Sequence, residues 1–112
     1  MSAVALSGRG RRTKGVKGER EVTKLFDERG YDVRGLEGLG DQIATKGKPG
    51  ALLCFHLEVK RQERLRIHEW LRQCVDETPA GMIPLLTYRR SSETWVAVMP
   101  LLDLLDLLER LE

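Results

Sequence analysis

The apolar positions in the first half of the chain predict one helix followed by three strands. Val22, Leu25 and Phe26 recur at helical spacing. The helix is predicted from about Val16 to Arg29, and Gly30 ends it. Three apolar runs follow, separated by glycine-rich turns of the kind that join strands. They predict strands at residues 31–36, from residue 41 onward and at 51–61, the last two joined by a hairpin loop at 46–50.

The second half predicts a helix, two strands and a last helix. Ile67, Trp70 and Cys74 share one face of the second predicted helix. The runs IPLLTY and TWVAVM predict strands, and Pro100 opens a leucine-rich helix. The order α-β-β-β-α-β-β-α predicts an α/β fold in which helices flank a mixed sheet. We expect one domain over residues 16–112, since a chain of this length has room for a single core.

The third predicted strand separates apolar from ionisable side chains. Its odd-numbered positions from Leu53 to Val59 are all apolar, and such a face packs on a helix. The even positions near its end hold His56, Glu58 and Lys60 on the other face, because side chains alternate along a strand. Ionisable groups beside a core need either a partner or a function.

Asp41 begins the neighbouring strand, directly after a glycine turn. If the two strands pair as a hairpin, Asp41 lies near Glu58. Adjacent carboxylates repel each other unless a cation lies between them, and their hard oxygen atoms suit Mg²⁺. Lys60 beside such an ion would stabilise developing negative charge. His56 shares this face, but a histidine at such a position is more often hydrogen-bonded within the structure than catalytic.

Glu19 supplies a further candidate from the first helix. It precedes Val22 by three residues and Phe26 by seven, so it flanks the buried face of that helix. A carboxylate at that margin would lean over the sheet toward the other acids. The sequence therefore predicts a site of three carboxylates and one lysine.

Charge is distributed unevenly along the chain. The composition, 41% hydrophobic and 32% charged, is that of a folded domain, and the net charge is only +2. We expect residues 1–15 to form a flexible basic arm, which favours a polyanionic partner, although a solvated tail accounts for the arm equally well. No apolar stretch approaches membrane-spanning length, so we expect a cytoplasmic protein, or one of the host cytoplasm if the gene is viral. The chain lacks a nucleotide-binding loop, and we expect no nucleotide cofactor.

Three segments together resemble the archaeal-type Holliday junction resolvases, a family of PD-(D/E)XK nucleases. The segments are KGVKGEREVTKLFDERGYDVR, GDQIA and LEVKR, which lie between about Lys14 and Arg61. The resemblance implies a restriction-endonuclease-like core. It also implies a homodimer that needs Mg²⁺, or Mn²⁺ as a substitute, and cuts four-way DNA junctions by paired symmetric incisions in recombination and repair.

By position in the matching segments, the resemblance implies that Glu19 is the family's helix carboxylate and that Lys60 is its catalytic lysine. Asp41 and Glu58 become the metal ligands, with the carbonyl of Val59 as a third. The chain departs from the family in having Gly40 in place of the motif proline, and in lacking the loop serine before the aspartate.

Basic residues beyond this set are candidates for phosphate contacts. Arg20 and Arg34 match basic positions of the family. The full set expected to contact DNA is Arg11, Arg12, Lys14, Lys17, Arg20, Arg34, Arg61, Arg64, Arg66, Arg89 and Arg90. Two alternatives stay open: another small nuclease of this superfamily that acts on flap or duplex DNA, and a non-catalytic DNA-binding module on the same fold.

Truncation before Lys14 tests the role of the basic arm. We expect weaker DNA binding and a flatter dependence of the binding constant on salt concentration, because fewer phosphate contacts release fewer counterions. Fluorescence anisotropy with a labelled four-way junction at several salt concentrations measures both quantities. A salt slope equal to that of the full chain would reduce the arm to a solvated tail.

Overall fold

A computed structural model describes residues 16–36 and 41–112 of the chain. The predicted basic arm at 1–15 and most of the glycine-rich turn, at 37–40, lie outside these residues. Within the described ranges, no helix combines the length and the apolar character that crossing a bilayer would require.

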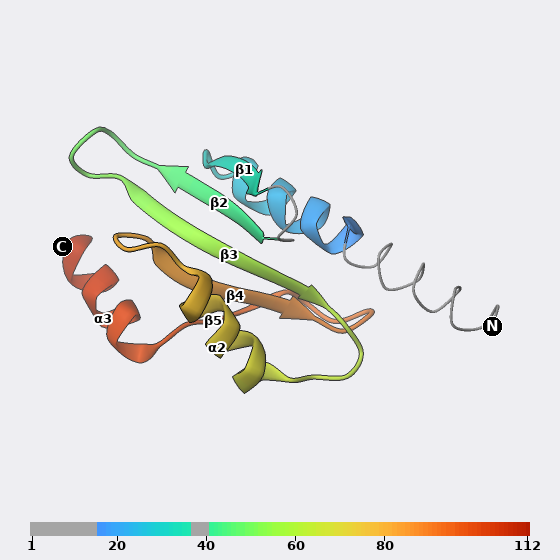
Figure 1. Cartoon of the computed structure of the whole chain (residues 1–112). Coiled ribbons are helices and arrows are strands. Elements are labelled where there is room, and N and C mark those ends of the chain that lie inside the picture. The colour runs from blue at the N-terminus through green and yellow to red at the C-terminus, as the bar shows by residue number, and fades with distance from the viewer. Residues whose placement is uncertain (1–15, 37–40) are drawn as a thin grey trace, which may run out of the picture.

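The described residues fold into five strands and three helices in the predicted order (Figure 1). The N-terminal helix spans 16–27 and ends two residues earlier than predicted, in a turn at 28–30. Gly30 closes this turn with a φ of 87°, a left-handed conformation that glycine adopts readily. The remaining elements are β1 (Asp32–Leu36), β2 (Asp41–Lys46), β3 (Leu53–Arg61), α2 (Ile67–Glu77), β4 (Ile83–Arg89), β5 (Val96–Val98) and α3 (Leu101–Arg110).

The strands form one mixed sheet whose spatial order follows the chain, β1-β2-β3-β4-β5. All neighbouring pairs are antiparallel except β3 and β4, which run parallel. Two neighbouring parallel strands need a long connection, and the segment that contains α2 connects β3 to β4. The predicted α/β fold with a mixed sheet and flanking helices is therefore confirmed.

A tight hairpin joins β2 to β3. Gly47 has a φ of 119°, and a Cβ built there would lie 2.7 Å from the carbonyl oxygen of Ala51. The Ala51 amide donates a hydrogen bond to the Lys48 carbonyl (2.9 Å), which closes the loop. The hairpin fixes the register, so that Asp41 lies opposite Glu58.

The two faces of the sheet have different neighbours. Phe55, Leu57 and Val59 form a buried apolar cluster with Val22 of the N-terminal helix, as the alternation along β3 predicts. The opposite face of β3 packs under α2 (Figure 1), whose Cys74 lies fully buried against the His56 carbonyl. Leu57 and His56, adjacent in sequence, are thus both completely buried, but in different layers.

A polar cluster ties the N-terminal helix to the far edge of the sheet. Arg89 of β4 donates two hydrogen bonds to the Glu21 carboxylate, at 2.9 and 3.0 Å. The indole N–H of Trp95 donates to the same carboxylate at 2.8 Å. The Arg89 hydrogen bonds hold the pKa of Glu21 below its ordinary value. Because both partners are engaged at two atoms, this pair fixes the helix more firmly than a simple surface ion pair would.

Helix α3 contacts the rest of the molecule along a narrow line. Leu107 packs against the apolar cluster, and Arg110 donates a hydrogen bond to the Leu52 carbonyl (2.8 Å). No residue of α3 is buried. Five leucines in or beside it are 44–75% exposed: Leu101, Leu102, Leu105, Leu108 and Leu111. Most of its apolar surface therefore faces outward.

Candidate metal centre

Two carboxylates meet face to face across β2 and β3. Asp41 and Glu58 occupy directly opposite positions of the antiparallel pair, as predicted, and each residue is only 2% exposed. Directly opposite residues project to the same side of a sheet with their Cβ atoms about 5 Å apart. Two acidic side chains are thus buried as close neighbours, an arrangement that is costly without a compensating positive charge.

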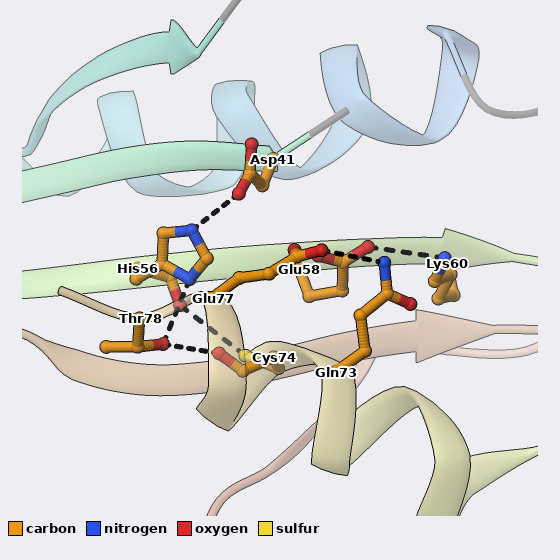
Figure 2. Close-up of polar contacts among 8 residues, drawn as sticks. All are labelled: Asp41, His56, Glu58, Lys60, Gln73, Cys74, Glu77 and Thr78. Atoms are coloured by element: carbon orange, nitrogen blue, oxygen red, sulfur yellow. Dashed lines mark hydrogen bonds and ion pairs between the residues drawn. The ribbon is translucent and has the colours of Figure 1, made fainter. Parts of the chain in front are cut away.

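His56 holds one oxygen of Asp41 in place (Figure 2). The Thr78 hydroxyl donates its single proton to the Cys74 carbonyl, so His56 Nδ1–H donates to the Thr78 oxygen at 3.0 Å. His56 Nε2 lies 2.5 Å from Asp41 Oδ2, within hydrogen-bonding distance. Both ring nitrogens have partners, as expected for a hydrogen-bonded rather than a catalytic histidine. The network fixes the orientation of the Asp41 carboxylate.

Lys60 provides the positive charge beside this pair. Its Nζ lies 3.2 Å from Glu58 Oε1, in the contact drawn in Figure 2. The two residues are separated by Val59 and project to the same face, as alternation along β3 requires. Burial raises the pKa of Glu58 above its ordinary value, and Lys60 offsets only part of this effect; the charges of Glu77 and Asp41 raise the pKa further.

Glu77 at the end of α2 joins the two acids. One carboxylate oxygen from each of Asp41, Glu58 and Glu77 lies within 4.8 Å of the others. The sequence prediction missed Glu77, although a signal was present: it follows Trp70 by seven residues and Cys74 by three, which places it on the sheet-facing side of α2. Gln73, one turn earlier on α2, is exposed and donates a hydrogen bond to Glu77 Oε1 at 3.2 Å.

The donor set fits a hard divalent cation. Asp41 Oδ1 and Glu58 Oε2 are buried and have no hydrogen-bond partner. Buried polar atoms in native proteins are normally satisfied, so each of these two oxygens is free to accept a ligand. Carboxylate oxygens are the ligands that Mg²⁺ and Mn²⁺ take in proteins. The carbonyl of Val59 stays a predicted ligand.

Glu19 does not join this group. Gln42 projects to the face opposite that of Asp41, and its side-chain amide donates to the Glu19 carbonyl at 3.4 Å. The N-terminal helix therefore lies on the apolar side of the sheet. Burial raises the pKa of Glu19, and the negative charge of Asp41 raises it further. Of the four predicted catalytic residues, the structure brings together Asp41, Glu58 and Lys60.

The predicted DNA contacts fall into three groups. Arg11, Arg12 and Lys14 lie outside the described residues. Arg89 is committed to Glu21, and its side chain is only 12% exposed, so a phosphate would have to displace that carboxylate. The others are exposed or half-buried and can reach a ligand: Lys17, Arg20, Arg34, Arg61, Arg64, Arg66 and Arg90. Three of these carry surface ion pairs of low strength, Arg34 with Asp32, Arg66 with Glu69 and Arg90 with Glu93.

Comparisons of the chain with protein-family models, with curated proteins and with solved structures found no match.

The raised pKa of Glu58 predicts how stability depends on pH when divalent metal is removed. The folded protein holds this proton more tightly than the unfolded chain does, so the free energy of unfolding falls as pH rises from the ordinary value of 4.5 through the raised pKa. Glu58→Gln removes this contribution, so without metal we expect the variant to gain stability relative to the wild type as pH rises.

Urea unfolding in EDTA between pH 5 and pH 8 measures the difference between the two proteins. Adding Mg²⁺ should raise the unfolding midpoint of the wild type but not that of Glu58→Gln, because a cation that binds only the folded state stabilises it. A variant that becomes progressively less stable than the wild type toward pH 8 in EDTA would contradict this account of the buried carboxylate.

Proposed function

We propose that this protein is a Mg²⁺-dependent, structure-selective endonuclease of the PD-(D/E)XK type that resolves four-way DNA junctions. The observation that carries the proposal is the Asp41–Glu58 pair. Both acids are buried, each retains an unpartnered oxygen, and Lys60 lies 3.2 Å from Glu58 on the same strand face. The helix, the three-strand meander and the parallel fourth strand reached through α2 are compatible with such a nuclease core.

Each residue of the group has a distinct task in phosphodiester hydrolysis. Asp41 and Glu58 hold the cation, and His56 keeps Asp41 in the orientation that leaves Oδ1 available. When bound, Mg²⁺ supplies an activated water and neutralises charge on the phosphate. The ammonium of Lys60 stabilises the negative charge that develops on the phosphate oxygens.

A DNA-binding module without catalysis fits the geometry less well. A protein that only binds DNA is aided by positive charge near the phosphates. The Asp41, Glu58 and Glu77 carboxylates outnumber the neighbouring ammonium of Lys60, and without a cation this group repels phosphate. Clustered acids are explained by metal-dependent chemistry and not by binding alone.

The substrate proposal depends on the resemblance to the resolvases and on the basic side chains around the site. Arg61 is the last residue of the strand that carries Glu58, and the exposed Arg64 and Arg66 follow it. Phosphates crowd together where the four arms of a junction meet, so basic side chains beside the site favour branched DNA. A nuclease that prefers flap or duplex DNA is the alternative that the experiment below distinguishes.

Asp41→Asn is expected to abolish cleavage and to preserve DNA binding. The amide removes a metal ligand, and the loss of one negative charge lowers the repulsion of phosphate, so affinity stays equal or increases. The assay uses labelled four-way, flap and duplex DNA with Mg²⁺ or with EDTA, alongside binding measured in Ca²⁺. We expect cleavage of the four-way junction by the wild type in Mg²⁺ only.

Lys24→Gln supplies a control, because Lys24 is exposed on the N-terminal helix and forms a surface ion pair with Glu28. This variant should cleave at a rate close to that of the wild type. Wild-type cleavage by Asp41→Asn would refute the active-site assignment. Preferential cutting of flaps or duplex would retain the nuclease but reject junction resolution.

We also propose that the protein acts as a homodimer. A junction needs two cuts in opposing strands, and a two-fold symmetric pair of chains supplies two matching sites. The five exposed leucines of α3 offer an apolar surface larger than a single helix of a monomer usually leaves open. We infer that this surface forms the interface between the two copies.

Light scattering at micromolar concentration is expected to give twice the mass of one chain. Leu105→Glu should shift the mass toward that of a monomer, because a charge at an apolar interface loses its hydration without a partner. Leu25→Glu is the matched control: Leu25 is 41% exposed on the N-terminal helix, close to the 44% of Leu105. A monomeric wild type would reject the dimer, and a dimer in both variants would move the interface away from α3.

A further inference from the structure

We infer that Glu77 of α2 is the third carboxylate ligand of the cation, so that the metal joins α2 to the β2–β3 hairpin. This inference rests on the metal site of the proposed nuclease and adds a ligand that the sequence resemblance does not supply. It starts from the observation that oxygens of Asp41, Glu58 and Glu77 lie within 4.8 Å of one another.

The spacing of the three oxygens suits one small ion. Mg²⁺ binds oxygen at about 2.0–2.1 Å, so ligands on opposite sides of it are roughly 4.2 Å apart and adjacent ones closer. Adjacent ligands on such an ion are roughly 3 Å apart. Oxygens separated by no more than 4.8 Å would therefore close on the ion by side-chain movements of about 1 Å. Asp41 and Glu58 each also keep a buried oxygen without a hydrogen-bond partner.

Glu77 is exposed but its position is restrained. The side-chain amide of Gln73, one turn earlier on α2, donates to Glu77 Oε1 at 3.2 Å (Figure 2). Thr78, the next residue, is anchored through its hydroxyl to the Cys74 carbonyl and to His56. Fixing a free glutamate side chain costs conformational entropy, and these contacts reduce that cost before the ion binds.

Glu77 also approaches from the correct side of the sheet. Asp41 and Glu58 face α2, whereas the N-terminal helix that carries Glu19 covers the apolar face. A carboxylate on α2 therefore reaches the ion directly, and one on the N-terminal helix has to reach around the sheet edge. With Glu77 included, three carboxylates meet beside Lys60 and His56, and a divalent cation between them would offset their mutual repulsion.

Isothermal titration calorimetry of the full chain with Mn²⁺, without DNA, tests this assignment. We expect Glu77→Gln to lower the affinity for Mn²⁺ about tenfold or more, and by more than Glu19→Gln does, since even the loss of an outer contact to a metal ligand costs that much. Asp76→Asn is the matched control, because it removes the same charge from the adjacent, exposed position of α2. Its affinity should stay within about twofold of the wild type.

Hydrogen exchange supplies a second measurement. If Glu77 acted only through its charge, Mn²⁺ would not change amide exchange in α2. If Glu77 is a ligand, Mn²⁺ should slow amide exchange in α2 of the wild type and of Asp76→Asn, but not of Glu77→Gln. Equal Mn²⁺ affinity in the Glu77→Gln and Asp76→Asn variants, with unchanged protection of α2 by the metal, would overturn the inference.

Two further variants separate this result from a failure of the proposed function. If Asp41→Asn and Glu58→Gln lose Mn²⁺ binding while Glu77→Gln keeps it, the metal site stands and Glu77 is not a ligand. If the wild type binds no Mn²⁺, or if Asp41→Asn and Glu58→Gln bind it as the wild type does, the metal site itself is wrong and the role of Glu77 falls with it.

Discussion

The pairing of Asp41 with Glu58 across β2 and β3 is the constraint on which the rest of the site depends. Burial makes two neighbouring negative charges costly, and the surrounding residues offset that cost in different ways. His56 forms a hydrogen bond with Asp41, and Lys60 pairs with Glu58. Neither contact uses the remaining oxygen of each acid. A fold that retains such a group gives up stability for a concentrated negative charge, as functional sites commonly do.

The two faces of the sheet carry different kinds of side chain: one face holds the apolar cluster, and the other holds the ionisable groups. One face of β3 contributes Phe55, Leu57 and Val59 to the apolar cluster, where the free energy of folding is gained by burial. The other face carries His56 and Glu58 beneath α2, where the polar groups are aligned. Because the two faces belong to the same strand, the apolar cluster on one face holds in place the strand that carries His56 and Glu58 on the other.

Features that depend on residues close together in the sequence could be predicted, and features that depend on tertiary packing could not. The period of two in β3 and the turn after Lys46 correctly placed Asp41 opposite Glu58, because a hairpin is set by nearby residues. The position of α2 over the sheet depends on tertiary packing of Trp70 and Cys74, so the approach of Glu77 was not foreseen. Glu19 was expected to lean toward the acids, but periodicity alone does not say which face of the sheet a helix covers.

The tight hairpin at Gly47 gives the site an unusual vulnerability. Register on a strand has a period of two, so a shift of one residue exchanges the inward and outward sets. A single deletion between Leu53 and Glu58, with the hairpin intact, would present Val59 to Asp41 and turn the glutamate toward the apolar cluster. Asp41, Glu58 and Lys60 would all remain in the gene, yet the carboxylate pair would be lost. A change in the length of that short segment is therefore more damaging to the pair than most changes of its side chains.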